Sequence, residues 1–352
     1  MPDRIPFLRL QQQQIAAQRF QTPQDLLAWM GALQAQDYPM MKWAAGLRLP
    51  GATEQGIDAA LAAGTVIRTH ALRPTWHLLP AADIYWILEL TAPHILASMR
   101  SRHRELELSG ELLSRSRAVL EAELRGGQHK TREDLKPVLE AAGIRNDDNR
   151  LAHVLLCAEL EGLICSGPGS GSRQTYALLP EVVPQARRLP REEALATLAL
   201  RYFRSHGPAT LADFGWWSGL PAGDARRALA SVRHLLREEQ AGGSAYWMDA
   251  EAQPADPEPG RLYLLPAFDE YLVSYKDRQA VLPQAQHQRA VHVNGVFRPI
   301  IVHEGQVIGT WKRSAKGSRV LLEAEWFGVP DPELEAAFVR EGEAFRRFRG
   351  AE

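Results

Sequence analysis

The sequence of 352 residues contains only two cysteines, Cys157 and Cys165. Two thiols are too few for a disulfide framework, a cysteine-rich zinc site or a four-cysteine iron–sulfur cluster. The sequence also lacks an apolar run of the roughly 20 residues that a membrane-spanning helix needs, and its first residues lack the apolar centre of a signal peptide. We therefore expect a cytoplasmic protein that makes no membrane contact.

The sequence also lacks an excess of either charge, because 41 Lys and Arg residues are balanced by 42 Asp and Glu residues, for a net charge of −1. A nucleic-acid partner would therefore have to be held by local basic patches. Residues 167–172 are rich in glycine but lack the Gly-Lys-Ser/Thr ending of a phosphate-binding loop, which argues against a nucleotide cofactor. His70 and His77 lack a third ligand at a recognisable spacing, so we expect no metal and no cofactor.

A domain-sized repeat organises the chain. Leu-Leu-Pro ends three strand-like runs, at residues 78–80, 178–180 and 264–266. Upstream of each stands a Thr-x-x-Asp pair, in which the threonine can cap a helix and the acid can bond back to the cap. The pairs are Thr22 with Asp25, Thr131 with Asp134, and Thr210 with Asp213. Each copy reads as three helices followed by a β-hairpin, which is the order of a winged helix-turn-helix.

The predicted fold is a mainly helical α+β chain of three tandem winged helices and a small C-terminal antiparallel sheet or barrel. Its expected boundaries are 1–100, 101–188, 189–285 and 286–352. In the first unit we expect helices at 8–20, 22–33 and 56–63, and a hairpin at 65–79. The second has helices at 111–125, 131–143 and after 148, and a hairpin to 178. The third has helices at 192–203, 210–217 and 224–236, and a long hairpin from 246–248 back through 262–264. Strands at 291–301, 306–311 and 320–326 and a helix at 333–348 complete the chain. The first unit alone carries a long insertion, 34–52.

Two basic hairpins are candidates for DNA contact. The first carries Arg68, His70, Arg73, Trp76 and His77, a set suited to phosphate contact and base stacking. The second has no acid between Gln306 and Leu322, and its candidates are Lys312, Arg313, Lys316 and Arg319. A basic hairpin can enter or straddle a groove of DNA. In both cases the alternative is an ordinary hairpin whose charges are solvated.

Four stretches together resemble the AlkZ/YcaQ family of bacterial DNA glycosylases, over essentially the whole chain. They are residues 33–36 (Leu-Gln-Ala-Gln), 68–78, 213–220, and 264–271 with 275–278. The resemblance implies three winged helices around a concave DNA-binding cleft, and a catalytic Gln-x-Gln motif that Gln34 and Gln36 match. It also implies excision of bulky or crosslinked N7-alkylated purines from double-stranded DNA. The family pattern leads us to expect glycine where this chain has Pro74.

The chemistry of two glutamines is consistent with that reaction. Residues i and i+2 share a side only in an extended segment, and Pro39 disfavours a helix running on from residues 22–33, so we expect residues 34–36 to be extended. A neutral amide can hold a water molecule but is a poor base. It suffices for a cationic N7-alkylpurine, which departs neutral and needs no general acid. Asp37 should point away and act at most as an electrostatic helper. The alternative is that both glutamines only satisfy backbone groups in a loop.

No lysine stands out as a lyase nucleophile, so we expect a monofunctional glycosylase, in the cytoplasm and on the nucleoid when DNA-bound. Tandem units without dimerisation heptads favour a monomeric enzyme. The main alternative is a non-catalytic winged-helix DNA-binding regulator, because this fold usually only binds DNA. A protein-interaction scaffold is a third possibility.

Overall fold

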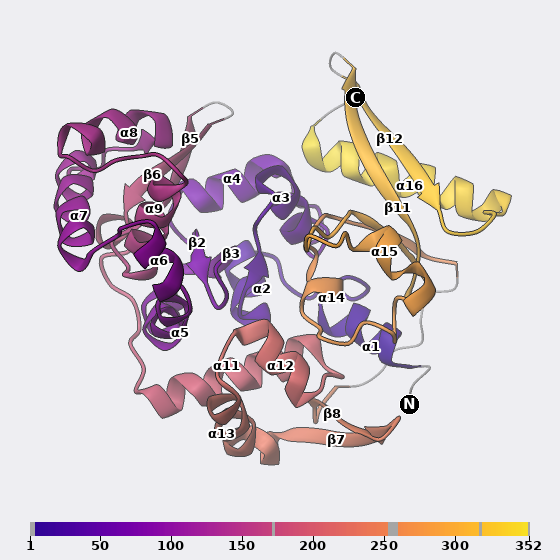
Figure 1. Ribbon diagram of the computed structural model, residues 1–352. Helices are drawn as coiled ribbons and strands as arrows, with labels where there is room; N and C mark the ends of the chain where they lie inside the picture. Colours follow the sequence, from indigo (N-terminus) through magenta and orange to yellow (C-terminus); the bar gives the residue numbers. More distant parts are fainter. Residues whose placement is uncertain (1–3, 171–172, 253–259, 317–318, 351–352) are drawn as a thin grey trace.

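The computed structural model describes residues 4–170, 173–252, 260–316 and 319–350 (Figure 1). It is an α+β structure of helices and small antiparallel sheets. The helices are α1 (Ile5–Gln12), α2 (Pro23–Met30), α3 (Tyr38–Gly46), α4 (Glu54–Ala62), α5 (Ile84–Ser98), α6 (Arg100–Glu105), α7 (Gly110–Leu124), α8 (Arg132–Ala141), α9 (Arg150–Leu160), α10 (Leu179–Val182), α11 (Arg191–His206), α12 (Leu211–Ser218), α13 (Ala222–Val232), α14 (Glu270–Val273), α15 (His287–Ala290) and α16 (Pro332–Arg349). None of these helices is long and apolar enough to cross a membrane.

The strands form four sheets within the described part of the chain. They are β1 (Leu33–Gln34), β2 (Val66–Ala71), β3 (Thr75–Pro80), β4 (Lys130–Thr131), β5 (Ile164–Ser170), β6 (Arg173–Leu178), β7 (Leu236–Ala241), β8 (Ser244–Asp249), β9 (Leu262–Leu265), β10 (Ile300–His303), β11 (Gln306–Lys316) and β12 (Arg319–Trp326). The sheet orders are β1-β3-β2, β4-β6-β5, β7-β8 and β12-β11-β10-β9.

The Thr-x-x-Asp pairs act at helix starts as predicted. Thr131 and Thr210 form capping boxes, in which each threonine accepts the main-chain N–H of its aspartate and the aspartate accepts the N–H of the threonine. Thr22 accepts the N–H of Asp25 at the start of α2. Such caps satisfy donors that the first helical turn leaves without partners, so they fix where α2, α8 and α12 begin.

The second segment follows the predicted order of three helices and a hairpin. Helices α7, α8 and α9 precede β5 and β6, and β4 adds a third strand to the hairpin. The segment has its own hydrophobic core, in which Leu120, Leu135, Leu155 and Ile164 are buried. Figure 1 shows it set to one side of the molecule, with the β5–β6 hairpin extending toward α4.

The third segment corrects one expectation. Helices α11, α12 and α13 occur where predicted, but β8 pairs with β7 and does not return through residues 262–264. Gly242 and Gly243 both have positive φ, which allows a two-residue turn and closes a short β7–β8 hairpin. Strand β9 pairs instead with β10. A strand inside the predicted unit 189–285 thus belongs to the same sheet as strands of the predicted unit 286–352.

The C-terminal sheet packs against the first segment. Glu304 and Gly305, both with positive φ, form the turn between β10 and β11. The first strand is shorter than predicted, because β10 begins only at Ile300. Residues 317–318, between β11 and β12, lie outside the described residues. Leu264 and Ile301 of this sheet share a core with Leu26, Leu78 and with Phe345 of α16.

The first segment lies at the centre. Helix α1 stops at Gln12, short of the predicted residue 20, and Gln14 has a positive φ. Helices α2 and α4 and the β2–β3 hairpin form as expected, and the insertion supplies β1 and α3. Figure 1 shows α3 and α4 between the β5–β6 hairpin and the β11–β12 hairpin. The insertion is therefore held by the parts of the fold that follow it in sequence.

Candidate active site

Residues 33–36 leave the helix and run beside a strand, as predicted. Helix α2 ends at Gly31, whose φ of 78° suits glycine and whose added Cβ would lie 3.2 Å from the Trp217 ring. Strand β1 then pairs with β3, where Gln34 faces His77. The N–H of Ala35 donates to the carbonyl oxygen of Trp76 at 2.7 Å. Residues 33–35 are thus extended alongside β3.

The two glutamines both contact that hairpin but differ in exposure. Gln34 is only 7% exposed, and its Oε1 accepts from Arg73 Nη2 at 2.8 Å. Gln36 is exposed, and its Oε1 lies 3.4 Å from the main-chain N of Trp76. Arg73 occupies one of the two lone pairs of the Gln34 side-chain oxygen, so that oxygen can accept one further hydrogen bond.

The remainder of the insertion is anchored as well. Asp37 caps α3 by accepting the N–H of Met40 at 3.1 Å, and Pro39 lies in the first turn of that helix, where proline is well accommodated. Beyond the other end of α3, Arg48 is fully buried and forms an ion pair with Asp269 at 2.8 Å. Both flanks of α3 are therefore anchored, and the carboxylate of Asp37 is engaged as the cap of this helix.

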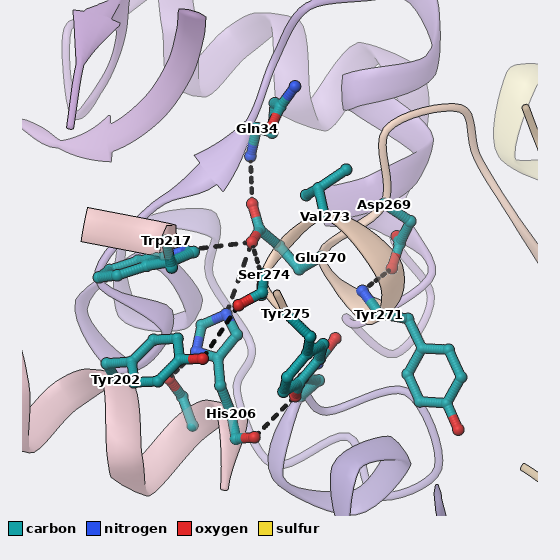
Figure 2. Close-up of polar contacts among 12 residues, drawn as sticks. Gln34, Tyr202, His206, Trp217, Asp269, Glu270, Tyr271, Val273, Ser274 and Tyr275 are labelled. Atoms are coloured by element: carbon teal, nitrogen blue, oxygen red, sulfur yellow. Dashed lines mark hydrogen bonds and ion pairs between the residues drawn. The ribbon is translucent and has the colours of Figure 1, made fainter. Parts of the chain in front are cut away.

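Glu270 lies beneath this segment and was not identified from the sequence. Figure 2 shows its carboxylate between Gln34, Trp217, Ser274 and His206. Its Oε1 accepts the main-chain N–H of Gln34 at 2.5 Å, and its Oε2 accepts from Trp217 Nε1 at 3.2 Å and from the Ser274 hydroxyl. His206 Nε2 lies 3.6 Å from the same oxygen.

Glu270 is ionised in this surrounding. Burial alone would raise the pKa of its carboxyl, but His206, Ser274 and Arg73 together hold that pKa at about 2. A buried carboxylate is stable only when donors satisfy it, and here Gln34 of β1, Trp217 of α12 and Ser274 at the end of α14 donate to it. The sequence carries no local signal for this, because Glu270 is 236 residues from Gln34.

Arg73 and His77 of the first hairpin turn inward. Arg73 donates to Gln34 and, at 3.3 Å, to the carbonyl oxygen of Val273, and burial lowers the pKa of its guanidinium. His77 is fully buried, with Nδ1 placed 2.9 Å from the carbonyl oxygen of Thr75. Burial and the neighbouring Arg73 lower the pKa of His77 to about 3, so the ring is neutral. The DNA contact predicted for His77 has no exposed surface to use.

Arg68 likewise serves the interior. It is 1% exposed, and its Nε and Nη2 donate to the carbonyl oxygen of Ala35 at 3.1 and 3.0 Å. Its Nη1 donates to Ser166 Oγ and Gln174 Oε1 of the β5–β6 hairpin. Burial lowers the pKa of this guanidinium to about 10, which leaves it charged at neutral pH. The predicted phosphate contact of Arg68 is therefore corrected: the side chain joins residues 33–36 to the second segment of the fold.

Trp76 and His70, like Arg73, are partly exposed. The Arg68 guanidinium lies over the Trp76 ring at 3.9 Å from its centroid, and the His70 ring is tilted against Trp76 with centroids 4.1 Å apart. His70 Nδ1 bonds to the buried carboxylate of Glu159 in α9. The turn residue Pro74 is exposed.

The second basic hairpin reaches solvent. Lys312 is 74% exposed, and its Nζ lies 2.8 Å from Glu323 of β12. Arg313 is half-buried, and burial followed by the nearby Arg349 lowers the pKa of its guanidinium. Lys316 and Arg319 lie at the ends of β11 and β12, and their side chains lie outside the described residues.

One aromatic residue differs from expectation. A core position is usual for neighbouring tryptophans on a short helix, and Trp217 is fully buried, but Trp216 is 43% exposed. The Trp216 indole donates to the carbonyl oxygen of Val273, the same oxygen that accepts from Arg73. The partly exposed Trp216 and Arg73, the residue that binds the Gln34 side chain, therefore share one main-chain acceptor.

Comparison with known proteins identifies the class of this protein as a DNA glycosylase. The family model "DNA glycosylase AlkZ-like" matches residues 27–348, so the chain belongs to that family. The enzyme class predicted from the sequence is thereby confirmed.

Two relatives extend this comparison. The chain is 24% identical over 348 residues to an interstrand DNA cross-link repair glycosylase of Streptomyces sahachiroi, covering 93% of this chain and 90% of that protein. Its fold is similar to the solved structure of Streptomyces sahachiroi DNA glycosylase AlkZ, with a TM-score of 0.77 at 22% identity, covering 98% of this chain and 96% of that one.

Proposed function

We propose that this glycosylase hydrolyses the N-glycosidic bond of N7-alkylated purines in duplex DNA, including bulky and crosslinked adducts. The observation that carries the proposal is the extended segment on which Gln34 and Gln36 lie against the β2–β3 hairpin. The name of the Streptomyces sahachiroi relative, a cross-link repair enzyme, supports the inclusion of crosslinks.

In this mechanism Gln34 and Gln36 hold a water molecule beneath C1′ of the damaged nucleotide. As the bond to the purine breaks, positive charge develops on the sugar and the cationic base leaves as a neutral molecule. The water oxygen then bonds to C1′ and loses a proton to solvent, which leaves an abasic site. Since a neutral site cannot activate the poor leaving group of a normal purine, undamaged DNA is spared.

The same proposal assigns DNA contacts to residues that solvent can reach. The β11–β12 hairpin would contact phosphates through Lys312, Arg313, Lys316 and Arg319. On the first hairpin, Trp76 would contact the damaged nucleotide, and His70 and Arg73 would orient the residues that make this contact. We further propose that the three helix-and-hairpin segments act as winged helices around the duplex, and that the enzyme works as a monomer without cofactor.

A single-turnover assay on a duplex with one N7-methylguanine, developed with alkali to cut abasic sites, tests this function. Alkali-sensitive product formed faster than spontaneous depurination supports it, and a parallel duplex with an interstrand crosslink tests the wider substrate range. If neither duplex is cut and binding depends on sequence but not on the lesion, the DNA-binding regulator becomes the better account.

A further inference from the structure

Gln34 is held at two points by the two ends of one short helix. Its main-chain N–H donates to the side chain of Glu270, the first residue of α14. Its side-chain oxygen accepts from Arg73, which also donates to the carbonyl oxygen of Val273, the last residue of α14. Figure 2 shows the Gln34 side chain directed away from Glu270. Helix α14 therefore fixes both the position of the Gln34 main chain and the orientation of the Gln34 side-chain amide.

The carboxylate that does this is itself fixed. Glu270 is 1% exposed, and Trp217, Ser274 and His206 approach its second oxygen from α12, the end of α14 and α11. A side chain with this many packed partners has no second rotamer within reach. The Gln34 N–H and the Trp217 indole can only donate, and they approach opposite oxygens of the carboxylate, so a neutral amide of the same shape can accept from only one of them. Because Trp217 and Ser274 both donate to Oε2, we expect the amide oxygen to take that side and the NH2 group to face the Gln34 N–H.

We propose that Glu270 is a positioning residue for base excision, acting through the main-chain N–H of Gln34. The inference rests on the proposed function, since it assigns Gln34 a role in holding water. Catalytic geometry must be kept to a fraction of an ångström, and Gln34 stands in a two-residue strand that cannot supply this rigidity by itself. Glu270 supplies it from outside the segment.

The test compares Glu270→Gln with a control of the same chemistry. Asp83→Asn is the control, because Asp83 is also buried, accepts from a tryptophan indole, Trp86, and pairs with an arginine, Arg201, without contacting Gln34. For each variant we would measure amide hydrogen exchange of the 33–36 segment, DNA affinity and the single-turnover rate of base release.

We expect Glu270→Gln to speed exchange at Gln34 by about tenfold or more. The rate of base release should fall by about tenfold or more while DNA affinity is unchanged. Asp83→Asn should lower thermal stability but leave exchange at Gln34 at the wild-type rate. Unchanged exchange in Glu270→Gln, or faster exchange with an unchanged rate of base release, overturns the proposal. If wild type releases no base, the proposed function fails, whereas faster exchange in Glu270→Gln would still support the anchoring of Gln34.

Discussion

Replacing Arg68 by methionine separates a structural role from a DNA contact. Methionine keeps an apolar stem of similar length but removes all four hydrogen bonds of the guanidinium. It leaves the carbonyl oxygen of Ala35, which is 0% exposed, without its two donors. An unsatisfied buried acceptor costs about 1–3 kcal/mol, and the bonds to Ser166 and Gln174 add to this. Since the guanidinium no longer has to be desolvated, part of the loss is offset, and we expect a net destabilisation of about 3 kcal/mol.

Urea unfolding and the salt dependence of DNA binding measure the two roles separately. Arg68→Met should lower the free energy of unfolding and leave the slope of log affinity against log salt at its wild-type value. Lys312→Met is the matched control, because Lys312 is exposed and its bond to Glu323 is a surface ion pair. It should leave stability nearly unchanged and reduce the slope by about one. A reduced slope in Arg68→Met without loss of stability would refute this reasoning.

Two further predictions concern acid stability and the turn at Gly31 that precedes β1. His77 has a pKa of about 3 when folded against 6.5 when unfolded, so the unfolded state binds the extra proton and stability falls as pH drops below about 6.5. At one pKa unit per ~1.4 kcal/mol, the His77 contribution to the free energy of unfolding falls by about 2 kcal/mol when the pH is lowered from neutral to about 5. In urea titrations His77→Phe should therefore lose less stability than wild type between these two pH values. An equal loss in both proteins would contradict the assignment. Gly31→Ala places a side chain at φ 78° and close to Trp217, so it should destabilise the protein by about 1–2 kcal/mol and slow base release. Wild-type melting and wild-type rate would show that β1 does not depend on this turn.

Local signals in the sequence predicted much of the fold. Helical periodicity and the caps at Thr131 and Thr210 located α7 to α9 and α11 to α13, because a helix is stabilised by residues near one another in the chain. The pairing of β9 could not be predicted in that way. Leu262 and Leu264 suit either sheet, and the choice depends on the distant partner Ile301 and on the closure of the β7–β8 turn.

The candidate site shows the same division. Gln34 and Gln36 are predicted as site residues because they match the Gln-x-Gln motif of the family that the chain resembles, whereas Pro39, a local feature, predicts only that their segment leaves the helix. Burial of Arg68 was not predictable, because β2 is buried on both faces and gives no alternation of polar and apolar residues. Glu270 was missed for a related reason: although it stands in the family-like stretch 264–271 and bonds to the nearby Ser274, its contacts with β1, α11 and α12 depend on the tertiary fold.

The most direct test of the account is the rate of base release by Gln34→Ala and Gln36→Ala on a duplex with one N7-methylguanine. Gln21→Ala provides the control, because Gln21 is an exposed glutamine just before α2. We predict that both active-site variants bind DNA as wild type does and lose about tenfold or more in single-turnover rate, and that Gln21→Ala retains the wild-type rate. Wild-type rates in both Gln34→Ala and Gln36→Ala would contradict the assignment of the catalytic segment.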